Sequence, residues 1–213
     1  YMGENLINWA EKNLNRGYFK MEDVHHGSEL FLGFLPRYID LFPENLKAKE
    51  LIINVSKFIG NWDKETEDWY NYSLKNFNSW YFGSDGISDK KNYKFNTADH
   101  LRFVHIALLA WKITSDQKYL DWSIDYSKRF AEKIIFAKET IPVAWNCEWK
   151  EFFSKDMINP EEKFLASNHH HFKNDPLSGI ENLIASGFIY VFGELYHITK
   201  DNIFLESSKK IIK

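Results

Sequence analysis

The stretch that decides the predicted fold is ADHLRFVHIALLAWKITSDQKYLDWSIDYSKRFAEKII, residues 98–135. Its first half places apolar side chains at helical spacing, from Leu101 to Trp111. Ser115 and Asp116 then form a turn and cap signal. A second apolar stripe follows at the same spacing: Tyr119, Trp122, Tyr126, Phe130 and Ile134. The stretch therefore predicts two antiparallel helices joined by a tight turn.

Two other stretches, residues 27–62 and 182–213, show the same pattern. In the first, the turn is FPEN, and we expect Pro43 in the first turn of the second helix, where its missing N–H has no cost. In the other, the turn ITKDNIFL (198–205) matches ITSDQKYL (113–120). A helical hairpin is thus predicted to recur along the chain, with long irregular inserts between the copies.

The first helix of each hairpin is the more apolar one, with little polar surface over 104–111 and 188–192. Such helices are predicted to be buried on all sides, with the more polar second helices outside them. This arrangement predicts an all-α fold of α/α-toroid type, with residues 1–213 as one α-helical hairpin domain. Three hairpins and an opening helix near 4–14 are fewer than a closed toroid contains, so we expect a partial toroid, a fragment of a larger one, or a smaller bundle.

The hairpin pattern and the T-x-D-x-x-Y-L turn resemble the α/α-toroid carbohydrate-active enzymes, which include six-hairpin glycosidases and several polysaccharide lyases. Asn168-His169 is similar to the Asn-His pair of some toroid alginate lyases, although the aromatic pattern that follows the pair in that family is replaced here by His170, His171 and Phe172. The resemblance implies a polysaccharide lyase that cleaves a uronate-containing glycan by β-elimination.

That chemistry needs a base for the C5 proton, a neutralising partner for the uronate carboxylate and an acid for the leaving oxygen. The resemblance implies His169 or His170 as the base. It implies Asn168 and Arg102 for neutralisation, and His100 or a tyrosine as the acid.

Polar, histidine-bearing segments precede each of the more apolar helices, at 21–29, 94–105 and 167–182, and hold seven of the eight histidines. If the hairpins pack around one axis, these segments meet in one funnel that favours anions and proton exchange. Tyrosine and tryptophan in the inserts add candidate platforms for sugar rings. The predicted substrate-binding residues are His25, His26, Glu29, Asn96, Asp99, Asp175, Trp80, Tyr81, Trp145 and Trp149.

Three alternatives stay open at this point. A glycoside hydrolase would use two carboxylates, but nothing in the sequence selects a pair. A non-catalytic helical module would bind a glycan or a partner. A divalent metal held by His26 and Glu29, three residues apart, could assist either chemistry, but we expect no cofactor to be required.

The composition limits the classes of partner that we expect. The formal charge is −3, with no long basic run, so we expect no nucleic acid and no membrane as partners, and an oligosaccharide or polysaccharide as substrate. A single cysteine, Cys147, excludes an intramolecular disulfide and a thiolate zinc site. No apolar run reaches the length of about 18 residues that spans a bilayer. We expect a soluble protein, either cytoplasmic or secreted with its signal peptide removed.

Overall fold

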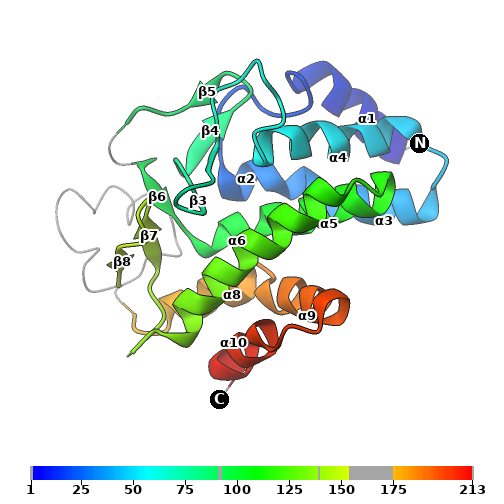
Figure 1. Cartoon of the computed structure of the whole chain (residues 1–213). Helices are drawn as coiled ribbons and strands as arrows, with labels where there is room; N and C mark the ends of the chain where they lie inside the picture. Colours follow the sequence, from blue (N-terminus) through cyan, green and yellow to red (C-terminus); the bar gives the residue numbers. More distant parts are fainter. Residues whose placement is uncertain (1, 91–92, 139, 154–174, 213) are drawn as a thin grey trace.

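The computed structural model describes residues 2–90, 93–138, 140–153 and 175–212 (Figure 1). Its helical segments, in chain order, are α1 (Met2–Asn13), α2 (Val24–Glu29), the π-helical turn η1 (Leu30–Phe34), α3 (Leu35–Leu41), α4 (Leu46–Ile59), the 3-10 turn η3 (Ala98–His100), α5 (Leu101–Thr114), α6 (Gln117–Ile135), α8 (Ser178–Ala185), α9 (Phe188–Thr199) and α10 (Asn202–Ile212). The strands are β1 (Glu22–Asp23), β2 (Tyr70–Asn71), β3 (Asn76–Phe77), β4 (Tyr81–Gly83), β5 (Gly86–Ile87), β6 (Phe95–Asn96), β7 (Ala144–Asn146) and β8 (Glu151–Phe152).

The prediction of an all-α toroid is wrong, because the fold is mixed. The described strands form three small antiparallel sheets, in the orders β1-β4-β5, β2-β3 and β6-β7-β8. Figure 1 shows the labelled strands gathered to one side of the helices. A chain of 213 residues is also too short for a closed ring of helical hairpins.

The sheets arise in the inserts that the helical periodicity does not cover. Residues 81–87, YFGSDGI, form a hairpin in which Gly83 pairs with Gly86 across a two-residue turn. Gly86 has a φ of +124°, a conformation that side-chain-bearing residues rarely adopt. Aromatic residues flank such turns and pair across the strands, as Phe82 does with Ile87. In the described residues, the inserts therefore contain short hairpins.

The repeated turn is confirmed in atomic detail. In the α5–α6 hairpin, Ser115 adopts a left-handed φ of 58° and Asp116 caps α6 by accepting a hydrogen bond from the Lys118 amide. In the α9–α10 hairpin, Lys200 has the same φ of 58°. In both turns a threonine hydroxyl accepts the amide of the aspartate at 3.1 Å: Thr114 to Asp116, and Thr199 to Asp201. The matching letters thus reflect one local geometry.

The first hairpin is formed by α3 and α4, but its cap differs from the prediction. Asn45 is the N-cap of α4, and its side chain accepts a hydrogen bond from the Ala48 amide at 3.0 Å. Pro43 therefore lies before the cap, in the turn, and not in the first turn of the helix. Asparagine is the stronger signal because its side chain satisfies a donor that the helix leaves open.

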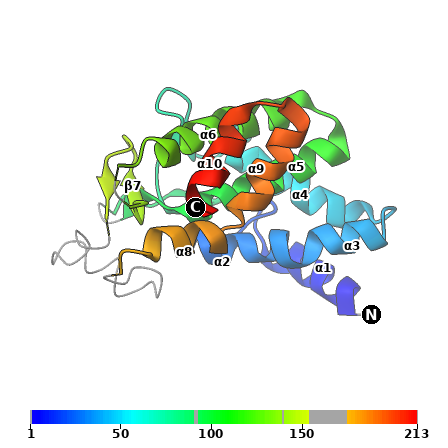
Figure 2. The same ribbon diagram turned by 90° about the horizontal axis from the view of Figure 1, so that it is seen from below.

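The helices pack around α5, which contacts α4 and α6, while α10 packs on α6 and α9 (Figure 2). Helix α5 is buried along most of its length, as predicted. The expectation that α9 is buried on all sides is wrong, because Tyr190 is 77% exposed and Ile189 is 41% exposed. Only one stripe of α9 faces the core: Phe188, Val191, Phe192 and Leu195. Within the described part of the chain, no helix has both the length and the apolar character needed to cross a membrane.

We predict that Gly83→Ala lowers the free energy of unfolding by roughly 2 kcal/mol, because overpacking a dense region forces backbone shifts. A Cβ on Gly83 would overlap the backbone carbonyl of Lys20, which has no side-chain freedom with which to move aside. Gly193→Ala is the matched control, since a Cβ there meets nothing within 4 Å. Urea unfolding of both variants checks the prediction. Equal stability of the two alanine variants would contradict it.

Candidate functional site

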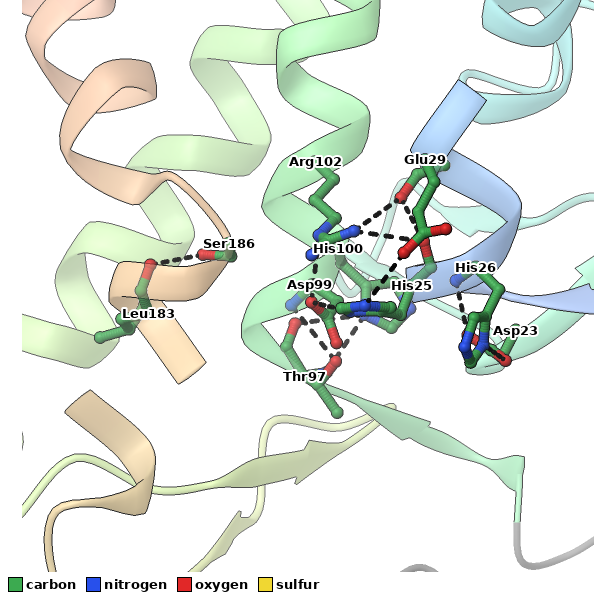
Figure 3. Close-up of polar contacts among 11 residues, drawn as sticks. Asp23, His25, His26, Glu29, Thr97, Asp99, His100, Arg102, Leu183 and Ser186 are labelled. Atoms are coloured by element: carbon green, nitrogen blue, oxygen red, sulfur yellow. Dashed lines mark hydrogen bonds and ion pairs between the residues drawn. The ribbon is translucent and has the colours of Figure 1, made fainter. Parts of the chain in front are cut away.

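Two of the three histidine-bearing segments meet at one place, as Figure 3 shows. His25, on α2, has its Nδ1 atom 3.3 Å from Asp99 Oδ1 and its Nε2 atom 3.5 Å from Glu29 Oε1. The imidazole therefore lies between two carboxylates. The side chains of His25 and Asp99 are largely buried, at 14% and 15% exposed, whereas Glu29 is 59% exposed.

Local sequence rules explain these positions. Helix α2 begins after its N-cap Asp23, so His25 and Glu29 fall four residues apart on one face of the helix. Asp99 lies in η3, the turn that opens α5. That turn is held by a capping box in which the Thr97 hydroxyl accepts the Asp99 amide and the His100 ring accepts the Thr97 amide. Turn η3 contacts both α2 and α8, and so places Asp99 beside α2.

Arg102 holds the two segments together. Its Nε atom lies 3.2 Å from Asp99 Oδ1 as an ion pair, without the alignment of a hydrogen bond. Its Nη1 group donates to the backbone carbonyl of His25 at 3.2 Å. The Arg102 side chain is only 12% exposed, which makes this a largely dehydrated ion pair. The result is a fixed cation next to a fixed imidazole.

A pocket of about 610 Å³ adjoins this cluster. Glu29, Arg37 and Arg102 line one part of it, and Ser186 and Tyr190, from the α8–α9 region, line the other. Two arginines against one glutamate favour an anionic ligand, although Asp99 offsets part of the charge of Arg102. The exposed Tyr190 ring offers a flat surface at the rim.

His105 also lines the pocket, and its environment keeps it neutral. Burial lowers the pKa of His105 below its ordinary value, against a hydrogen bond with the Gly187 backbone that raises it. A neutral imidazole at physiological pH can accept a proton. The pocket therefore has ionised, anion-attracting groups on one wall and a neutral histidine beside them.

A second hollow, of about 700 Å³, lies between α1 and the α3–α4 turn. Phe34, Tyr38 and Phe42 line it, with Glu4 and Glu44 as its charged residues. It brings no histidine or arginine into reach of these carboxylates. The pocket beside His25 is therefore the better candidate for acid–base chemistry.

Several predicted site residues lie in the core. His100 is fully buried, with its Nε2 atom 3.1 Å from the Ser79 carbonyl, and its ring does not reach solvent. Asn96 is fully buried and donates to the Phe77 carbonyl at 2.9 Å. A ring buried on both faces cannot stack on a sugar, which corrects the prediction for three of the aromatic platforms, Trp80, Trp145 and Trp149.

The remaining predicted residues are placed elsewhere. Tyr81 is partly buried and stacks on Tyr93 at 4.9 Å between ring centroids. Asp175 accepts the Leu177 amide at the start of α8. His26, predicted to pair with Glu29, pairs with Asp23, and its Nδ1 atom lies 2.6 Å from Asp23 Oδ2. Asn168, His169 and His170 lie outside the described residues.

The sequence did not select Arg37, His105 or Tyr190 for the site. Arg37 falls eight residues after Glu29, across the π-helical turn Leu30–Phe34, and both side chains line the pocket. Tyr190 lies in an apolar run that predicts a fully buried helix, so the sequence did not indicate that this side chain is exposed. The contacts of α5 with α9 and with η1, which leads into α3, bring these residues to one pocket.

Neither a scan against protein-family models nor a search of curated proteins finds a match to this chain.

Proposed function

We propose that the protein acts on an acidic saccharide as a polysaccharide lyase, in the pocket bounded by α2, α5 and the α8–α9 region. The observation that carries the proposal is His25 held against Asp99, with its backbone carbonyl bonded to Arg102, which lines the adjoining pocket together with Arg37. This arrangement offers an oriented proton acceptor next to cations able to neutralise a carboxylate, which β-elimination requires together.

In this proposal Asp99 accepts the Nδ1 hydrogen of His25 and leaves Nε2 to take the C5 proton of a uronate. Arg102 and Arg37 bind the uronate carboxylate and stabilise the charge that develops as the proton leaves. Tyr190 stacks on a sugar ring at the rim of the pocket. Electrons from the broken C–H bond form the C4–C5 double bond while the C4–O bond breaks, and the leaving oxygen takes a proton.

The geometry favours this reaction over hydrolysis. A glycosidase needs open space between its two carboxylates for the scissile bond, and in a retaining enzyme for the anomeric carbon. Glu29 and Asp99 are the two carboxylates that contact His25, and the His25 ring lies between them. No sugar fits between these two groups while the imidazole is there.

We predict that His25→Gln lowers kcat at least about a hundredfold, because a positioned general base contributes roughly 10²–10⁴-fold. Arg37→Gln, at an exposed position, should mainly raise KM by loss of a carboxylate contact. The assay follows ultraviolet absorbance of the unsaturated product together with new reducing ends, on alginate, pectate, glycosaminoglycans and neutral glucans. His197→Gln and Arg129→Gln, which lie outside the pocket lining, are the matched controls.

The outcomes separate the candidate functions. Absorbance and reducing ends that both fall in His25→Gln support the lyase. Reducing ends without absorbance indicate hydrolysis and contradict it. If His169→Ala or His170→Ala abolishes the activity while His25→Gln does not, the base is one of those residues and the role given to His25 is wrong. If no glycan gives absorbance or new reducing ends, but one of them binds saturably in calorimetry, the protein is a binding module.

A further inference from the structure

We propose that Glu22, Asp23 and His26 form a binding site for a first-row divalent metal ion. In this proposal the Tyr18 hydroxyl is an outer hydrogen-bond partner of the site. One potential ligand atom from each of the three residues lies within 4.8 Å of the other two. Two carboxylates and one imidazole form a mixed oxygen and nitrogen ligand set, which suits Zn²⁺, Fe²⁺ or Mn²⁺ better than Ca²⁺ or Mg²⁺. The proposal does not depend on the lyase proposal.

The backbone already fixes these three residues. Strand β1 pairs with β4, with Glu22 opposite Phe82 and Asp23 opposite Tyr81. Asp23 Oδ1 accepts the His26 amide at 2.9 Å, which caps α2, and Oδ2 lies 2.6 Å from His26 Nδ1. Metal sites on such rigid elements need little rearrangement to bind.

The second observation is a buried, unpaired hydroxyl close to this group. Tyr18 is fully buried, and its hydroxyl has no hydrogen-bond partner among the described residues. A Cβ on Gly27 would overlap that hydroxyl and would stand 3.5 Å from the Glu22 Cβ, so the hydroxyl lies at the first turn of α2 beside Glu22. A buried donor without a partner destabilises the fold. A ligand there that accepts a hydrogen bond would remove this cost.

Binding has a simple balance of atoms and charge. The metal takes the place of the hydrogen between Asp23 and His26, so a protonated His26 ring loses one proton to solvent, whereas a neutral ring keeps its single proton on Nε2. The two ligand atoms then separate from 2.6 Å to about 3.3 Å, the spacing of two ligands on tetrahedral Zn²⁺. A metal-bound water fills the open position, and Tyr18 donates to it or to the Glu22 carboxylate as an outer partner. His26 is 58% exposed, which leaves an entry path.

The test is calorimetric titration with Zn²⁺. Because the run His169-His170-His171 can itself bind metal, the titration is made in the full chain and in a background with these three residues changed to Gln. We expect one Zn²⁺ per chain in the background, and the same binding event in the full chain together with any binding by the histidine run. His26→Gln should weaken that event more than about tenfold, and Asp23→Asn should do the same while its side chain still caps α2.

Two further variants sharpen the result. Tyr18→Phe should weaken Zn²⁺ binding, since loss of an outer partner typically costs about 10–100-fold, yet leave the metal-free protein at least as stable as before. His197→Gln is the matched control and should bind as the parent does. The proposal fails if no Zn²⁺ binds in the background, or if binding there is unchanged by His26→Gln. Tighter binding of Ca²⁺ than of Zn²⁺ would also overturn it.

Discussion

Replacing Trp69 with alanine is expected to lower the free energy of unfolding by about 4 kcal/mol, within the range measured for large aromatic deletions in cores. Trp69 is fully buried and stacks on Phe82 at 4.3 Å and on Phe58 at 5.2 Å between ring centroids. Its Nε1 group donates to the Gly83 carbonyl at 3.1 Å. The substitution therefore opens a cavity between α4 and the β4–β5 hairpin and leaves a buried carbonyl without its donor.

Urea unfolding followed by circular dichroism measures this effect. Trp9→Ala is the matched control, because Trp9 is 44% exposed on α1 and its loss should change stability by less than about 1 kcal/mol. Trp69→Phe should recover part of the loss by refilling the ring volume. A Trp69→Ala variant as stable as the Trp9→Ala variant would mean that the helices and the sheet do not share one core.

The second large effect is a loss of stability in mild acid caused by His100. Burial lowers the pKa of His100 to about 4, against weaker raising effects from its backbone hydrogen bonds and from Asp99. The neutral ring accepts the Thr97 amide at Nδ1 and lies 3.1 Å from the Ser79 carbonyl at Nε2. Protonation would put a charge in an aromatic environment and remove the acceptor.

The sign follows from proton counting. Between about pH 6.5, where an unfolded histidine titrates, and about pH 4, the unfolded chain binds a proton that the folded chain does not. The free energy of unfolding therefore falls as the pH falls through this window, by on the order of 3 kcal/mol for His100 alone. His105, whose pKa is also lowered by burial, adds to the loss in the same direction.

Comparing the pH dependence of unfolding in the parent and in His100→Gln isolates the contribution of His100 to the free energy of unfolding. The substitution has a cost that does not vary with pH, so the difference between the two curves should shrink as the pH falls from 7 to 5. A constant difference across that range would show that His100 titrates normally in the folded protein.

The repeated turn and the cap at Asp116 followed from the sequence because they depend on neighbouring residues. The repeated Thr-x-Asp turn and the cap at Asp116 each involve contacts within four residues. Short-range rules of hydrogen bonding and helical geometry are enough to predict them.

The sheets, the fate of the aromatic residues and the pocket were decided by tertiary structure. Tryptophans in the inserts look the same in sequence whether they face a sugar or the core, and packing on Phe130 and Tyr126 buries Trp145 and Trp149. His26 could pair with Asp23 or Glu29 at equal separation, and the cap at Asp23 selects the first. Likewise, Arg102 joins His25 across 77 residues, a contact set by how α2 packs on η3 and α5 and by no local pattern.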